Sequence, residues 1–142
     1  GQVIGEVYTR LDQTDYAAEM AQIRAAKPDV VFHFHPGALG IAFMRQYQQA
    51  GLLGTIPMVL AEPSMDHTLL KTVGEAALGT DVSGAWNADF DNPVNKAFVE
   101  AFTKKYGRTP TMYAAQGYDT AIAISAALKA IDGKIDKVDG VR

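Results

Sequence analysis

The run Asp29-Val30-Val31-Phe32-His33-Phe34-His35-Pro36-Gly37, DVVFHFHPG, decides how the fold of this chain is interpreted. Its apolar part lacks strict polar alternation, which is typical of a strand in a parallel sheet that helices cover on both faces. Pro36-Gly37 ends the run, because proline and glycine break regular structure. The stretch therefore predicts a strand over residues 29–35 that leads through a turn into a helix.

The segments around this strand alternate in the same way. Further strands are expected at residues 3–8, 56–61 and, more weakly, 80–85, from their β-branched and apolar residues. Helices are expected between the strands, from about Thr14 or Asp15 to residue 27, from 39 to 50, and from about 67 to 73. This order predicts an α/β fold with a doubly wound parallel sheet and right-handed crossovers.

The chain changes character after Trp86. Asp91-Asn92-Pro93 predicts the start of a helix that ends at Tyr106-Gly107, and a second helix is expected from about residue 113 to 131. Two helices in succession leave apolar faces that no strand after residue 85 covers. We therefore divide the chain into an α/β segment at residues 1–86 and, at 87–142, a crossover with two trailing helices of another lobe.

Composition limits the functions that are open to the chain. It has 142 residues with 48% hydrophobic and 20% charged side chains, which fits a globular protein, and its formal net charge of −3 comes with scattered basic residues. Nucleic acid is therefore not an expected partner. The chain has no cysteine, and no apolar run approaches the roughly 18 residues of a membrane span.

The ligand site is expected where parallel strands end, because loops that leave their carboxyl ends surround a common crevice. The loop at His35, Pro36, Gly37 and Ala38 would form one wall, and its helix start would offer free N–H groups to an anion. Glu62, followed by Pro63, is either a pocket acid that holds an ammonium or acts as a base, or a solvated loop acid. Trp86 is either an aromatic side chain facing the cleft or buried cover.

The two histidines, which are separated by one residue, also suggest a metal site. His33 and His35 share one face of the strand, and Glu62 would be the third ligand, which defines a metal-dependent hydrolase as an alternative function. No diagnostic spacing fixes such a set, so we expect no metal, no other cofactor and no catalytic residue. The competing interpretation makes His33 a packed side chain inside the sheet and His35 a pocket wall.

A family resemblance becomes clear from motifs along nearly the whole chain. These include AAKPDVVF at residues 25–32, RQY at 45–47, AGL at 50–52, GEAALG at 74–79, NPVNKAF at 92–98 and YAAQGYD at 113–119. In this order they resemble the leucine/isoleucine/valine-binding family of periplasmic solute-binding proteins, which serve ABC importers. The resemblance implies a type I receptor with two doubly wound lobes, and this sequence is similar to most of the second lobe and two helices of the first.

The resemblance also implies the function and the partners. We expect a periplasmic protein without catalysis that captures an amino acid or a small carboxylic acid, aromatic acids included, between its lobes and delivers it to an ABC permease. An acid at the position of Glu62 holds the ligand ammonium in the amino-acid binders, but their aromatic contact near His35 or Pro36 is absent here. A ligand-sensing receptor domain of the same fold is the alternative.

The resemblance further implies that a central strand of the sheet is missing from this sequence, in the order 2-1-3-4-5. Such a sheet exposes apolar surface, which normally leads to association. We therefore expect the chain to self-associate or to need its missing segments.

Overall fold

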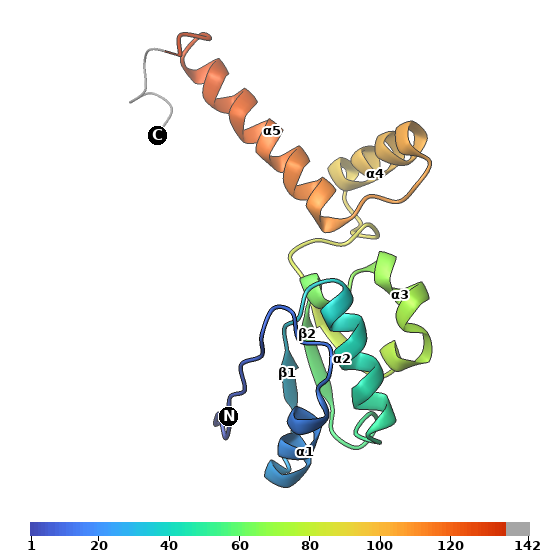
Figure 1. Cartoon of the computed structure of the whole chain (residues 1–142). Helices are drawn as coiled ribbons and strands as arrows, with labels where there is room; N and C mark the ends of the chain where they lie inside the picture. The colour runs from blue at the N-terminus through green and yellow to red at the C-terminus, as the bar shows by residue number, and fades with distance from the viewer. Residues whose placement is uncertain (136–142) are drawn as a thin grey trace. The chain divides into compact units, whose positions relative to one another are not determined.

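The structure, a computed structural model, describes residues 1–135 and divides the chain into two compact units, Gly1–Ala85 and Trp86–Arg142. The first unit is an α/β layer (Figure 1). Its strands are β1 (Val31–His33), β2 (Met58–Ala61) and β3 (Thr80–Ser83), and its helices are α1 (Ala17–Ala26), α2 (Ala38–Gln49), α3 (His67–Val73) and the short 3-10 helices η1 (Glu62–Ser64) and η2 (Gly74–Ala77). The predicted α/β fold class is confirmed.

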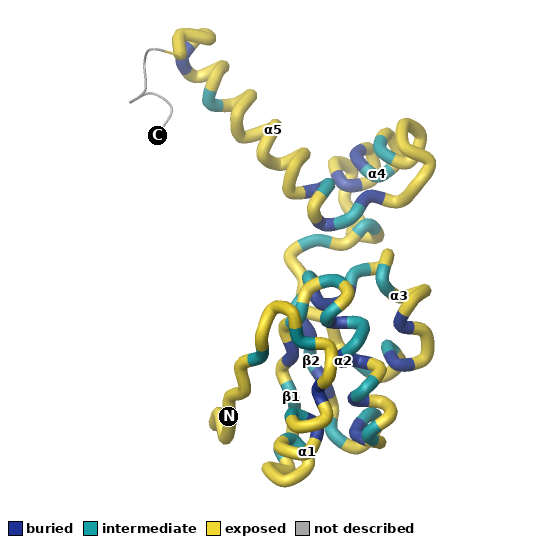
Figure 2. Tube along the Cα trace, viewed as in Figure 1, coloured by how far each residue is buried: buried dark blue, intermediate teal, exposed yellow. Residues whose placement is uncertain are grey.

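The sheet is parallel, with the strands in the order β1-β2-β3. His33, Leu60 and Val82 lie side by side in its register. One face of the sheet packs on α2 and forms the core, which is visible as the buried stretches of β2 and α2 in Figure 2. The largest side chains there are Tyr16, Phe43, Met44, Tyr47, Met58 and Leu60.

The helix ends follow the expected signals in most places. Asp66 caps α3 by accepting hydrogen bonds from the amides of Thr68 and Leu69, and Gly51 after α2 has the left-handed φ of +67°. The N-cap residue of α1 is Tyr16, one residue after Asp15, but the Asp15 carboxylate accepts a hydrogen bond from the amide of Ala17 at 3.0 Å, so it caps the start of the helix as predicted. The Tyr16 ring is buried in the core.

The predicted strand at residues 3–8 is wrong. The segment belongs to no strand, and its side chains are exposed, with Tyr8 at 89% (Figure 2). A strand needs a neighbour for its backbone groups, but among the described residues the sheet consists of β1, β2 and β3, and none of them pairs with residues 3–8. That the sheet lacks a central strand in the order 2-1-3-4-5 stays a prediction.

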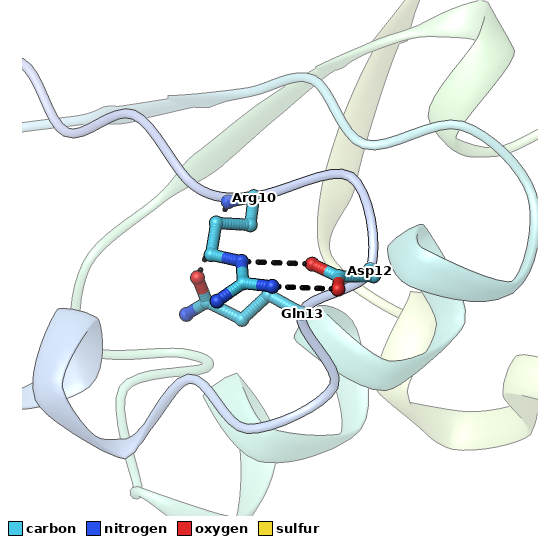
Figure 3. A network of polar contacts seen from close by, with 3 residues as sticks. All are labelled: Arg10, Asp12 and Gln13. Atoms are coloured by element: carbon cyan, nitrogen blue, oxygen red, sulfur yellow. Dashed lines mark hydrogen bonds and ion pairs between the residues drawn. The ribbon is translucent and has the colours of Figure 1, made fainter.

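A tight turn connects this extended segment to α1 (Figure 3). Arg10 donates two hydrogen bonds to the Asp12 carboxylate, at 2.9 and 2.8 Å, and its backbone amide donates to the side-chain oxygen of Gln13. Both ions are exposed, so the pair contributes at most about 1 kcal/mol. The Arg10–Asp12 pair instead helps to set the direction of the chain, which reverses at this turn.

The second unit consists of α4 (Pro93–Tyr106) and α5 (Met112–Ala130), as predicted. Asn92 caps α4 by accepting from the amide of Asn95 at 2.8 Å, and Gly107 ends it with a φ of +67°. Only Met112 and Ala115 are buried in α5, which is almost wholly exposed in Figure 2. Among the described residues, no helix is long and apolar enough to cross a membrane. That these helices belong to another lobe stays a prediction.

Candidate functional site

Two loops at the carboxyl ends of β1 and β2 meet, as the sequence predicted for parallel strands. We call residues 35–38 and 62–64 the two strand-end loops. The backbone amide of His35 donates to the Ser64 hydroxyl at 2.8 Å, and the amide of Gly37 donates to the carbonyl of Pro63 at 3.3 Å. The structure therefore joins His35 to Ala38 and Glu62 to Pro63 in one place.

Gly40, in the first turn of α2, allows this close approach. A β-carbon there would contact the carbonyl oxygen of His35 and lie 2.7 Å from that of Ser64. Both obstacles are backbone atoms that have little freedom to move. Ser64 is itself fully buried, so the loops are held by a packed junction rather than by surface contacts.

The start of α2 has no side-chain cap. Gly37 is the N-cap residue, and its φ of +61° with ψ of −131° is a conformation that favours glycine. Because no side chain accepts from the first amides of the helix, they are available to an anionic group of a ligand. This is the arrangement that the sequence predicted for residues 36–38.

A stack of aromatic rings lies behind the loops, and it decides between the two interpretations of His33 as a metal ligand or a packed side chain. The His33 ring is stacked on Phe43, with centroids 4.2 Å apart, and on His35 at 4.8 Å. It is 2% exposed, and neither ring nitrogen has a hydrogen-bond partner. Burial, and then the neighbouring His35, lower the pKa of His33 to about 3. His33 is thus a packed histidine, as the competing interpretation held.

His35 belongs both to this stack of rings and to the first strand-end loop. Its Nε2 is 2.6 Å from the hydroxyl of Thr9, while Nδ1 is buried without a partner. Burial lowers the pKa of His35, although Glu19 opposes this effect. His35 is therefore favoured as a neutral ring that lines the loop.

Glu62 is the carboxylate of the site. Its Oε2 atom is buried and has no hydrogen-bond partner. Burial raises the pKa of Glu62 above the ordinary value, the Ala85 backbone amide opposes this, and Asp66 adds to it. A partly desolvated carboxylate whose Oε2 atom has no partner among the described residues is an acceptor that a ligand ammonium or hydroxyl would satisfy.

Trp86 belongs to the second unit and is fixed within it. Its Nε1 donates to Asn95 at 2.7 Å, and its ring meets Phe98 edge-on at 5.9 Å. The Asn95 side-chain amide in turn donates to three carbonyls, those of residues 87, 88 and 90. Asn95 therefore shapes the crossover, which the sequence analysis missed, and a role of Trp86 in the ligand site stays a proposal.

The metal alternative finds no support in the geometry. Within residues 1–135, no group of three or more His, Asp or Glu side chains could hold an ion, so His33, His35 and Glu62 do not form a ligand set. Two open hollows lie elsewhere. One of about 590 Å³ lies between α1 and α2, and another of about 700 Å³ lies along α5, and no predicted site residue lines either of them.

Comparisons with known proteins agree on one family. The family described as periplasmic binding protein matches residues 1–142. A solute-binding protein of an ABC transporter from R. palustris, solved with benzoate, is 28% identical with a TM-score of 0.87, and a second one, solved with 4-hydroxybenzoate, is 27% identical with a TM-score of 0.87. A leucine-binding protein from Thermotoga maritima is 26% identical with a TM-score of 0.76.

These matches cover much more of this chain than of the solved proteins. The alignments include 99%, 99% and 87% of this chain but 38%, 39% and 35% of the three structures, in the same order. The chain therefore spans a little over a third of the length of these structures. A comparison with curated protein sequences finds no match.

Proposed function

The chain belongs to the periplasmic binding protein family, and from this we propose that it is part of the substrate-capture component of an ABC importer. It would supply one wall of a cleft between two lobes. The observation that carries the proposal is the junction of the two strand-end loops beside the buried Oε2 atom of Glu62, which has no hydrogen-bond partner among the described residues.

The ligand that we propose is an amino acid or a small carboxylic acid, aromatic acids included. Benzoate, 4-hydroxybenzoate and leucine are named for the similar proteins. In this chain the uncapped start of α2 suits an anionic group, and Glu62 suits a hydrogen-bond donor such as an ammonium or a phenol hydroxyl. Pro36 and Pro63 would line the wall between these two polar ends.

Transport without catalysis is the accompanying proposal. Ligand contacts from both lobes would favour a closed form, with residues 84–91 as the hinge and Trp86 near it, and a membrane permease would bind this closed form. The compartment that follows from this role is the periplasm. The support comes from the family.

A ligand screen tests the proposal. Binding to the native state raises its melting temperature, so the two-lobed protein that contains this chain would be screened against leucine, benzoate and 4-hydroxybenzoate. Glu62→Gln should abolish the shift from leucine, because an amide loses the charge that holds an ammonium, and should spare the shift from benzoate. Loss of both shifts would reject the ammonium role.

Glu75→Gln is the matched control for this screen. Glu75 lies exposed in η2 of the same unit, and its substitution removes the same charge without touching either loop. It should leave every shift as in the wild type. If no amino acid or carboxylic acid shifts the wild-type protein, the proposed function is wrong.

A further inference from the structure

Gly84, which follows the last residue of β3, lies directly against the Glu62 side chain. A β-carbon built at Gly84 would contact Oε2 of Glu62 and lie 2.9 Å from its Cδ and 3.2 Å from its Cβ. Real β-carbons almost never come within 3.0 Å of a neighbouring heavy atom. The carboxylate of Glu62 therefore occupies space that is open only because residue 84 has no side chain.

The position of this carboxylate matters because no hydrogen bond within residues 1–135 holds its Oε2 atom. Oε2 is buried and without a hydrogen-bond partner, and Glu62 begins η1 directly at the end of β2. Without the space at Gly84, the side chain would rotate toward solvent, where carboxylates are well hydrated. The contact thus decides where the acceptor of the site lies.

We propose that Gly84 is the positioning residue for Glu62, so that the space beside its bare Cα holds the carboxylate where it selects ligands with an N–H or O–H donor. This rests on the proposed function, in which Glu62 meets the ligand. It adds the end of β3 to the site, beside the two strand-end loops that follow β1 and β2. Selectivity would then depend on a residue that makes no ligand contact.

The backbone at Gly84 tolerates a larger residue. Its φ lies outside the left-handed range that penalises L side chains, and the closest atoms in its way belong to the far end of a flexible side chain. Gly84→Ala should therefore move the Glu62 carboxylate and keep the fold. Gly40 differs, because there the obstacles are backbone carbonyls.

Ligand selectivity is the first test, made in the two-lobed protein. Gly84→Ala should lower the affinity for 4-hydroxybenzoate or leucine, whichever the wild type binds, about 10- to 100-fold. This is the effect of losing a charge-assisted hydrogen bond. Benzoate, which has no donor opposite its carboxylate, should change little. Gly5→Ala is the control, because a β-carbon at Gly5 meets nothing within 4 Å.

A double-mutant cycle separates positioning from a general structural effect. Asp at position 62 is one methylene shorter and needs less of the space at Gly84, so Glu62→Asp should cost less affinity in the Gly84→Ala background than in the wild type. Residues that act independently would give additive losses. Additivity within error would overturn the proposal.

A ligand-free measurement tests the same point by NMR titration of the Glu62 carboxyl group. In the wild type, burial raises the pKa of Glu62. Gly84→Ala should bring this pKa toward its ordinary value, because the displaced carboxylate gains solvent. Identical titration in both proteins would refute the positioning role even if ligands bind. If the pKa changes in this way but the wild type binds no ligand, the proposed function is wrong and the positioning role of Gly84 stands.

Discussion

The His33 ring packs against the rings of Phe43 and His35, and its two nitrogens have no hydrogen-bond partner among the described residues. Its pKa of about 3 lies far below the ordinary value of 6.5. Between these pH values the unfolded chain binds a proton at His33 that the folded chain does not. The free energy of unfolding should therefore fall as the pH decreases through this window, by up to about 1.4 kcal/mol per pH unit from this residue.

His33→Phe tests this residue. Phe keeps a flat ring in the stack and removes both unpartnered nitrogens, so the free energy of unfolding should rise by about 1 kcal/mol at pH 7. At pH 5 the gain should be about 2 kcal/mol larger, because Phe cannot be protonated. Urea unfolding at the two pH values, at one chain concentration, gives both numbers. His67→Phe, at an exposed position of α3, should give no gain at pH 7. Equal pH dependence in the wild type and His33→Phe would contradict the prediction.

The site residues show which contacts a sequence reveals. Glu62 and residues 35–38 could be predicted, since parallel strands end at one edge and the polar residues after them are visible in the sequence. Ser64, Gly40 and Gly84 could not be predicted, because their importance lies in approaches between segments that are far apart in the chain. A glycine that makes room for a neighbour looks the same in sequence as a glycine in a turn.

At the level of the helix, α2 depends on the absence of a side chain in its first turn. Gly40→Ala should lower the free energy of unfolding by about 3 kcal/mol, because the new β-carbon pushes against the carbonyls of His35 and Ser64. Gly117→Ala is a matched control in α5, where a β-carbon meets nothing within 4 Å. It should be neutral or raise the free energy of unfolding by up to about 1 kcal/mol, since alanine favours helix. Denaturant unfolding of both variants measures these free energies. Equal effects of Gly40→Ala and Gly117→Ala on the free energy of unfolding would show that the junction is loose.

Helices could be predicted better than strands, for a physical reason. A helix makes its hydrogen bonds internally, so caps and proline positions locate its ends, as at His67, Val73 and Pro93. A strand exists only with a neighbour. Residues 3–8 have the composition of a strand and no neighbour in the sheet, while β1 covers three of the seven residues predicted for it.

Considered as a whole, the first unit covers one face of its sheet and leaves the other face open. Val31 and His33 turn toward the core side of β1, whereas Val30, Phe32 and Phe34 alternate with them and are 51%, 67% and 55% exposed. Within residues 1–135, no segment buries these three side chains. Apolar side chains in a row on an exposed face normally become an interface.

Self-association of the isolated chain is the consequence that sedimentation can measure. We expect species larger than the monomer that dissociate on dilution, because burial of this face contributes roughly 25 cal/mol per Å² of apolar area. The paired substitutions Phe32→Thr and Phe34→Thr should shift the equilibrium to the monomer, since they remove apolar area and keep residues that favour strands. Leu78→Thr, at an exposed position outside β1, should leave it unchanged. A wild-type chain that stays monomeric at every concentration and melts cooperatively would contradict this, and would show that one lobe is stable with its second face bare.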